Sequence, residues 1–456
     1  MSIVQNLSLT ALKARYRRGD YSPTAMVRDL FATIRQCPDE YIWTTLLDEE
    51  TCLSAAAELE KHGDAAHLPL FGIPFSVKDN IDTAGINTSC SCDAFQRMPD
   101  NNAEVVQRAI DAGAILIGKN SLDQFATGLS GTRVVKPHCK NPFKDAVIPG
   151  GSSSGSGVAV ARGLVTFAIG TDTGGSGRIP AAMNNIVGIK PTLGTLSDNG
   201  VVHNSRFLDT TSVFAQTVAE GQMIYAVLQD PGSTVNRLHS DPLTRGDQFN
   251  FCAPDLNQLD FFGDKQAEKA FAAAISTLES IGGTGHTIDL QVFAAARSMP
   301  FDSGLLAERH FNYGSVLASG DEALHPALKS TLQKAAGYSR DDLISALYRM
   351  KDLRASAHKQ LGGMDCLVLP TVARSFTCDE IKQDPVTNNH KIGHYTYFVN
   401  PLDLCAVAVP AAIKPDGVPF GISLIGLPGT DATVQSIGRR FQDAVELKPG
   451  IDAISI

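Results

Sequence analysis

The chain has no excess of basic residues and no apolar segment of membrane-spanning length. It has 39 Lys and Arg against 48 Asp and Glu, and this net charge of -9 disfavours nucleic acid or an anionic membrane as a partner. The longest apolar runs, 158–169 and 405–413, are interrupted by Arg162 and Pro410. Both are shorter than the roughly 20 residues that a membrane span needs. Residues 1–23 lack the pattern of a targeting peptide, so we expect a soluble, cytoplasmic protein.

The nine cysteines show neither a disulfide framework nor the spacing of a metal site. They are scattered from Cys37 to Cys405, and their odd number fits reduced intracellular thiols. The one close pair, Cys90 and Cys92, has no second pair or histidine cluster to complete a zinc site. We therefore predict no metal and no organic cofactor, and place this pair in a loop near the active cleft.

No internal repeat, linker or low-complexity tract divides the chain, so we predict one domain over residues 1–456. Helix and strand patterns alternate along it, which is typical of an α/β protein. The following elements are expected: helices from Pro23 to about Cys37, over 104–112 and over 157–163, helices capped by Asp264 and Ser339, a final helix from Asp431, and strands at 115–118, 165–169, 287–290, 366–370, 407–412 and 420–425.

Three segments rich in glycine and serine stand out: 72–80, 150–157 and 170–180. An amide carbonyl is unreactive, so its hydrolysis needs an activated nucleophile, a base and donors for the oxyanion. The glycines before Ser176 let a carbonyl approach the backbone, and successive N–H groups can converge on one oxygen. We predict Ser176 as the nucleophile, with an oxyanion hole formed by the main chain of Thr173, Gly174, Gly175 and Ser176.

None of the eleven histidines lies in these three segments, so the usual base is missing. A neutral lysine is the alternative, and Lys78 follows the apolar stretch 75–77. Burial must lower its pKa from about 10.4 by about three units, which is on the order of 4 kcal/mol. A hydroxyl between the two groups relaxes the geometry, and Ser152 is the candidate for this proton relay.

These motifs also have other interpretations. A glycine-rich loop such as 150–157 is able to bind phosphate, but this one lacks the Gly-Lys-Ser ending of a phosphate-binding loop. Asp172 and Arg178 flank the nucleophile, where they are better suited to bracing its loop than to chemistry. Arg133 is open to either use, as a pocket residue or as part of the scaffold.

The block 150–192, with Lys78 upstream, resembles the amidase signature family. That family uses a lysine, a serine with a cis peptide bond and a nucleophilic serine, and its two serines are 24 positions apart, as Ser152 and Ser176 are here. The resemblance covers nearly the whole chain and assigns Lys78, Ser152 and Ser176 to these roles. It implies an α/β fold with a large, mixed, mostly parallel sheet covered by helices on both faces.

Four stretches are similar to the allophanate hydrolase subgroup of that family: 120–129, 184–188, 307–309 and 393–400. Allophanate carries a carboxylate beside the scissile amide, and a guanidinium fork suits such a group. The resemblance assigns this role to Arg309 and adds Gly128 and Ser153 as substrate-binding residues. The structural alternative is that Arg309 only pairs with Glu308 or with a helix partner.

The chain departs from the subgroup at one position of the pocket. The subgroup has a tyrosine eight residues before the arginine, whereas this chain has Phe301. Either a neighbour such as Tyr313 supplies the hydroxyl, or carboxylate binding is weaker, or the substrate differs.

The resemblance implies release of ammonia from the terminal amide of allophanate, without a cofactor. Two alternatives remain: an amidase for another small carboxylated amide, such as a malonamate or biuret derivative, and the amidase subunit of an amidotransferase. Relatives often carry a further C-terminal domain, which we expect to be absent here after about residue 445, so we expect a stand-alone amidase or one piece of a larger enzyme. A homodimer is expected from family likeness alone.

Overall fold

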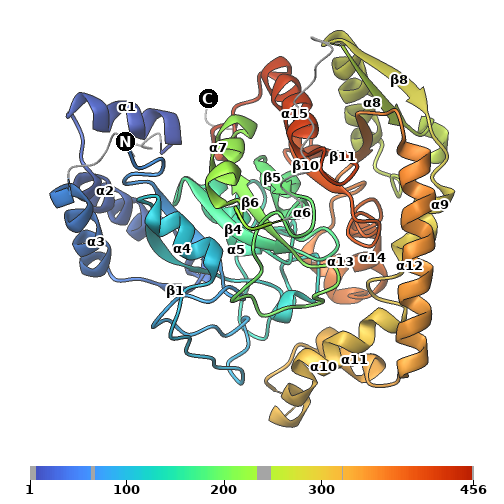
Figure 1. The fold of residues 1–456 in the computed structure, drawn as a ribbon, viewed down its shortest axis with the longest axis horizontal. Helices are drawn as coiled ribbons and strands as arrows, with labels where there is room; N and C mark the ends of the chain where they lie inside the picture. Colours follow the sequence, from blue (N-terminus) through green and yellow to red (C-terminus); the bar gives the residue numbers. More distant parts are fainter. Residues whose placement is uncertain (1–6, 63–66, 234–247, 321, 454–456) are drawn as a thin grey trace.

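The structure is a computed structural model that describes residues 7–62, 67–233, 248–320 and 322–453. Its described strands form one 11-stranded sheet in the order β1-β3-β2-β4-β6-β5-β10-β11-β9-β7-β8 (Figure 1). The strands are β1 Trp43–Leu46, β2 Pro74–Lys78, β3 Ile115–Asn120, β4 Phe167–Asp172, β5 Val187–Lys190, β6 Thr210–Ala215, β7 Phe249–Ala253, β8 Gly283–Thr287, β9 Cys366–Pro370, β10 Cys405–Ile413 and β11 Pro419–Gly426. The helices are α1 Leu9–Arg18, α2 Pro23–Gln36, α3 Glu49–His62, α4 Glu104–Asp111, α5 Ser154–Ala161, α6 Ile179–Met183, α7 Val218–Leu228, α8 Lys265–Ser280, α9 Gln291–Arg297, α10 Ala307–Tyr313, α11 Pro326–Ala335, α12 Arg340–Leu361, α13 Cys378–Gln383, α14 Thr387–Ile392 and α15 Asp431–Val445.

The α/β class and the mixed sheet are confirmed, but parallel pairing does not dominate. Two parallel blocks, β3-β2-β4 and β9-β7-β8, are joined through antiparallel pairs, and β1 adds another antiparallel pair at one edge. The expectation of a mostly parallel sheet is therefore corrected. One reason is local: β10 and β11 are connected through a tight turn at Asp416–Gly417, and such a turn joins only antiparallel strands.

Helices cover both faces of the sheet, and small residues let them approach closely. Side chains alternate between the faces along a strand. On β5, Gly188 lies against Ala181 of α6, whereas Ile189 lies against Gly221 of α7. Helix α5 contacts α6, so these two short helices share a face, and α7 and α15 pack on the other. The loop that contains Ser152 leads into α5, and the loop that contains Ser176 leads into α6. Both loops therefore lie on the same side of the sheet.

Most local predictions are confirmed. Ser22 caps α2 by accepting from Ala25 N, and proline takes the first helical position. The helix and strand predicted over 104–112 and 115–118 are α4 and β3, and β3 pairs in parallel with β2. Ser339 and Asp342 form a capping box at the start of α12. Strand β9 and the start of α15 lie where they were predicted.

Three boundaries differ from the predictions. Helix α5 begins at Ser154, three residues earlier than expected, and β4 covers Phe167–Asp172 instead of 165–169. The strand expected at 287–290 is instead β8, Gly283–Thr287, which directly follows the C-terminal turn of α8. Strand β8 is an edge strand with mostly exposed side chains, so it has no alternating apolar pattern that marks its position.

The segment from α9 to α12 builds one side of the molecule. Helix α12 packs along α9, and α10 lies against α11 near one end of α12 (Figure 1). In the part of the chain that the structure describes, no helix is long and apolar enough to cross a membrane.

Candidate active site

Lys78 ends β2 inside the protein, with its side chain fully buried. Its Nζ lies 2.7 Å from Ser152 Oγ and 2.9 Å from Thr171 Oγ1. Burial lowers the pKa of Lys78 to about 7, against opposing effects of Asp209, Asp123 and Asp172. At neutral pH a large fraction of this amine is therefore uncharged, as a lysine base requires.

Ser152 lies in the loop between Pro149 and α5, and the peptide bond Gly151–Ser152 is cis, as the resemblance implies. The loop is tightly enclosed, since a Cβ at Gly151 would overlap Asp123 Oδ2. The neighbouring Ser153 is predicted to bind substrate but does not line the pocket. It is buried, donates its hydroxyl to the Thr171 carbonyl at 3.2 Å and is not part of the pocket wall. Consecutive side chains on this loop point in different directions, and only that of Ser152 reaches Lys78.

Asp172 and Arg178 brace the nucleophile loop, as predicted. Arg178 donates Nε and Nη2 to the two oxygens of Asp172 at 2.9 Å each, and both side chains have no exposed surface. The same carboxylate accepts from Gly175 N at 2.8 Å and Gly177 N at 2.9 Å. Burial raises the pKa of Asp172, but Arg178 outweighs this effect, and the pKa stays below its ordinary value. The loop is therefore held around a charged carboxylate.

This brace corrects the predicted oxyanion hole at one residue. The amide of Gly175 already donates to Asp172, so it is not free to stabilise an oxyanion. The amides of Thr173, Gly174 and Ser176 donate to no acceptor among the described residues, and these three residues line the pocket. The carboxylate thus takes one N–H out of the predicted set and leaves the others available.

Ser176 faces the pocket, and its hydroxyl makes no hydrogen bond among the described contacts. The contact between Lys78 and Ser152 is present, whereas no contact between Ser152 and Ser176 is described. One of the two contacts that the predicted relay needs is therefore present. Proton transfer through the relay stays a prediction.

Side chains from remote segments support the same loop. Thr396 Oγ1 donates to the Gly174 carbonyl at 2.8 Å, and Asn400 Nδ2 donates to the Asp172 carbonyl at 2.7 Å. Thr173 Oγ1 donates to Asp209 Oδ1 at 2.6 Å. None of these roles was predicted. For Thr396 and Asn400 a signal existed, because both lie in the stretch 393–400 that carries the resemblance.

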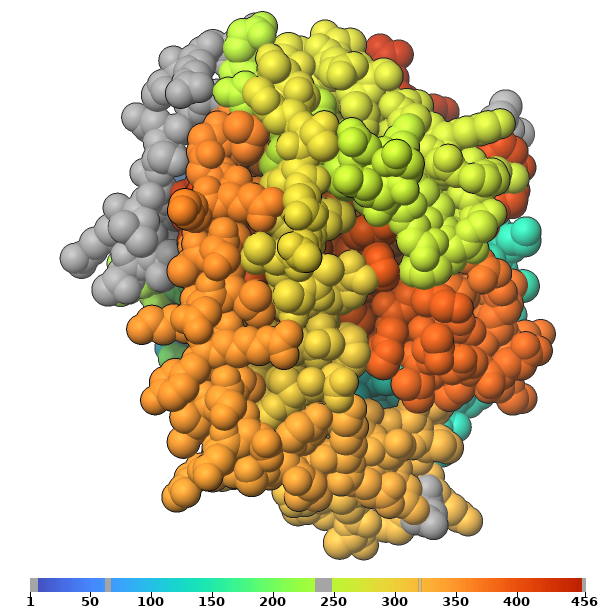
Figure 2. All heavy atoms as spheres, turned by 90° about the vertical axis from the view of Figure 1, so that its right-hand side faces the viewer, coloured from blue at the N-terminus to red at the C-terminus, as the bar shows by residue number. Residues whose placement is uncertain are grey.

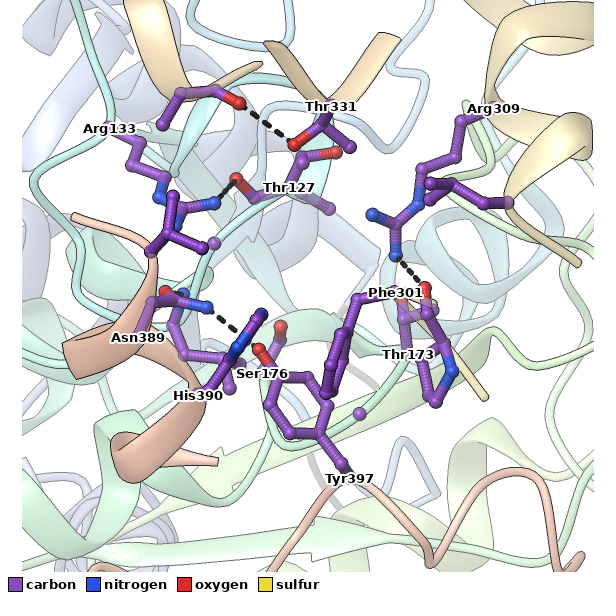
Figure 3. A pocket seen from close by; sticks show the side chains of 18 of the residues that line it. Thr127, Arg133, Thr173, Ser176, Phe301, Arg309, Thr331, Asn389, His390 and Tyr397 are labelled. Carbon is purple, nitrogen blue, oxygen red and sulfur yellow. Dashed lines mark hydrogen bonds between the residues drawn. The ribbon is translucent and has the colours of Figure 1, made fainter. Parts of the chain in front are cut away.

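The pocket is a cavity of about 130 Å³ beside Ser176 (Figure 3). Helices α10, α11 and α14 contribute to its walls, and a hollow opens between the yellow and orange segments of the face seen in Figure 2. The walls are formed by Ala126, Thr127, Gly128, Leu129, Arg133, Thr173, Gly174, Ser176, Pro300, Phe301, Leu306, Arg309, Ala327, Ser330, Thr331, Lys334, Val386, Asn389, His390 and Tyr397. Gly128 and Arg309 therefore lie at the site to which the resemblance assigned them.

The pocket wall contains cationic side chains and no carboxylate. Arg309 donates to the Pro300 carbonyl at 2.8 Å, and Arg133 donates to the carbonyls of Thr127 and Pro385 at 3.2 and 2.6 Å. The pairing of Arg309 with Glu308 is not observed, since Glu308 instead accepts from Ser205 and Arg206. Arg133 fits both interpretations, because it joins two loops as a scaffold residue does and also lines the cavity.

Tyr313 does not replace the hydroxyl absent from position 301. Its ring stacks on Phe125 at 4.6 Å, and its hydroxyl meets Thr127 Oγ1 at 3.0 Å, outside the pocket wall. Phe301 stacks on His390 with ring centroids 4.0 Å apart and lies 4.8 Å from the ring of Tyr397. The two aromatic residues that do face Phe301 were not singled out from the sequence.

Among the described residues, no group of three or more His, Cys, Asp or Glu side chains is arranged to hold a metal ion. The Cys90 backbone pairs with Asp79 and Phe125 beside the site, which confirms the loop position predicted for this residue.

The profile of the Amidase family matches residues 26–434, so the chain belongs to this family and is an amidohydrolase. Urea amidolyase of Lachancea kluyveri is 36% identical over 420 residues, which are 90% of this chain and 23% of that protein. The chain thus spans less than a quarter of this relative's length. A glutamyl-tRNA(Gln) amidotransferase subunit of an Exiguobacterium species is 29% identical, over 94% of this chain and 95% of that one.

A solved structure is similar over almost the entire chain. Allophanate hydrolase of Kluyveromyces lactis superposes with a TM-score of 0.89 at 29% identity, over 99% of this chain and 76% of that one. The arrangement of the sheet and its helices is therefore that of an amidase signature enzyme.

Proposed function

We propose that this chain hydrolyses the terminal amide of allophanate through Lys78, Ser152 and Ser176. The observation that carries the proposal is the buried contact of 2.7 Å between Lys78 Nζ and Ser152 Oγ, next to a cavity that Ser176 faces. A lysine whose pKa is about 7 has an available lone pair at neutral pH. No histidine is needed for this chemistry.

In the first step, Ser176 Oγ attacks the amide carbon. Its proton passes to Ser152, and the Ser152 proton passes to Lys78, so that the lysine becomes an ammonium ion. The amides of Thr173, Gly174 and Ser176 stabilise the negative charge on the carbonyl oxygen, and each such donor contributes roughly 3 kcal/mol.

In the second step, the C–N bond breaks. The proton returns from Lys78 through Ser152 to the leaving nitrogen, which departs as ammonia. Water then transfers a proton to the same relay and attacks the ester on Ser176, which releases N-carboxycarbamate and restores the free enzyme. All atoms come from the substrate and one water molecule.

The pocket supports a substrate that carries a carboxylate. Two guanidinium groups, Arg133 and Arg309, lie on opposite sides of the cavity, and both donate only to main-chain carbonyls among the described contacts (Figure 3). A carboxylate on the substrate provides the missing anion. The similarity to allophanate hydrolase and urea amidolyase favours allophanate among such compounds.

Two alternatives follow from specific observations. Phe301 lacks the hydroxyl of the subgroup, so another small carboxylated amide, such as malonamate or a biuret derivative, is the second candidate. The likeness to the amidotransferase chain over 94% of this chain makes a partner-dependent amidase the third. We further propose that residues 1–456 act as one domain, since a single sheet connects the described strands.

Steady-state ammonia release from allophanate, malonamate and biuret tests the proposal. We expect the highest kcat/KM for allophanate and no turnover by Ser176→Ala, whose labelling by a serine-directed fluorophosphonate should also be lost. Equal labelling of the variant would remove Ser176 from its role. Activity that requires added partner subunits would favour the amidotransferase.

A further inference from the structure

The hydroxyl of Tyr397 has a hydrogen atom for which the described residues provide no acceptor. Asn389 Oδ1 accepts from Leu129 N at 2.9 Å, and because a backbone amide can only donate, this contact fixes the orientation of the Asn389 side chain. Asn389 Nδ2 therefore donates to the Tyr397 hydroxyl at 2.7 Å. The phenolic oxygen acts as acceptor in that bond, so its own hydrogen remains available for another acceptor.

The ring of Tyr397 is held firmly at the pocket wall. It lies against two glycines: a Cβ at Gly174 or Gly393 would overlap the ring. Phe301 packs beside it, with ring centroids 4.8 Å apart. Gly174 precedes the nucleophile by two residues, and Figure 3 shows Tyr397 on the same wall as Ser176. The hydroxyl is thus directed by packing and by Asn389.

The surroundings of Tyr397 favour a negatively charged acceptor. Burial raises the pKa of Tyr397 to about 12, although Arg133 and Arg309 oppose this shift, so the hydroxyl stays protonated at neutral pH. Both guanidiniums line the same cavity, and no carboxylate does. A carboxylate of the substrate is therefore a suitable acceptor for this hydrogen.

We propose that Tyr397 determines specificity by donating its hydroxyl hydrogen to the substrate carboxylate, together with Arg309, in place of the hydroxyl that Phe301 lacks. This inference rests on the proposed function and adds to it the residue that distinguishes a carboxylate from a neutral amide. Such a substrate is a short acyclic monoamide with a carboxylate close to the scissile carbonyl.

The test compares Tyr397→Phe with wild type on allophanate and on biuret, in which an amide replaces the carboxylate. A hydrogen bond to a charged group is lost only with allophanate, so we expect KM for allophanate to rise roughly 10- to 100-fold. For biuret, kcat and KM should stay within about twofold. Adding Phe301→Tyr to the variant should recover much of the loss, because the two rings are neighbours.

Tyr395→Phe is the matched control. Tyr395 is a buried tyrosine on the same segment, and its hydroxyl accepts from Asp260 N at 2.7 Å, away from the pocket wall. Its loss should leave KM for allophanate unchanged. An unchanged KM in Tyr397→Phe, or equal losses on allophanate and biuret, would overturn the role of Tyr397 and leave the proposed function intact. A wild-type protein that does not prefer allophanate would overturn both.

Discussion

The two sides of the active site differ in how their charged side chains are paired. On the catalytic side, the Arg178 guanidinium is fully buried and bound by both oxygens of Asp172. On the binding side, Arg309 donates to one carbonyl, and Arg133 donates to two. A charge with its own counterion stabilises the loop that holds the nucleophile, whereas a charge without one is available to an anionic ligand.

Replacement of Lys78, the proposed base, has the largest expected effect. Lys78→Met keeps a side chain of similar length but removes the proton acceptor, and we expect kcat to fall at least roughly 1000-fold. Lys190→Met is the matched control, since Lys190 is also buried but donates only to the carbonyls of Pro191 and Leu404. The control should lower the melting temperature and leave kcat within a few-fold. Similar kcat values for both variants would contradict a catalytic role of Lys78.

Removing the counterion on the catalytic side should cost mainly stability. Asp172→Asn leaves Arg178 charged and buried, and we expect the free energy of unfolding to fall by about 3 to 5 kcal/mol. Chemical denaturation measures this change. Asp341→Asn breaks the exposed contact with Arg340 at 3.0 Å and should have little effect. Equal effects of the two substitutions would show that the buried pair does not brace the loop.

On the binding side, loss of a guanidinium should change substrate affinity more than stability. We expect Arg309→Met to raise KM for allophanate roughly 100-fold, because a charged hydrogen bond is lost. The melting temperature should remain close to that of wild type, since no described carboxylate loses a partner. Thermal unfolding and steady-state kinetics on the same preparation separate the two effects. A large fall in melting temperature with an unchanged KM would indicate that Arg309 has a structural role and does not bind substrate.

The smallest expected effect is that of pH on the catalytic side. Below pH 7 the Lys78 amine becomes protonated and cannot accept a proton, so kcat/KM should fall about tenfold per pH unit. The same shift has a consequence for stability. The unfolded state binds the extra proton between pH 7 and 10.5, so this group's contribution to stability falls as pH is lowered through that range. A kcat/KM that stays constant from pH 5 to 8 would contradict a lysine base.

The catalytic side was predicted in some detail, because its residues lie in three short motifs. Lys78 ends a strand, and Ser152 and Ser176 lie in loops that lead into helices on one face of the sheet. The main error concerned Gly175, whose amide binds Asp172. A glycine-rich motif indicates that N–H groups are accessible, but not which acceptor each one finds.

The binding side was predicted less well, because its residues are far apart in the chain. Arg309 and Gly128 followed from the resemblance, and both line the cavity. Neither Ser153 nor Tyr313 lines the cavity, because their hydroxyls bind Thr171 and Thr127. Tyr397 was part of a quoted stretch, but nothing in that stretch shows that its ring packs between Gly174 and Gly393.

Motif content and spacing were sufficient for the reaction class, since the proposed base, relay and nucleophile each lie in a short local pattern. Only the tertiary structure shows which partner each hydrogen-bond donor and each charged group has. Asp172 binds Arg178 and Gly175, while Asn389 orients Tyr397. The physical reason is that a hydrogen bond depends on distances and directions of a few tenths of an ångström between remote segments, and chain order does not specify these.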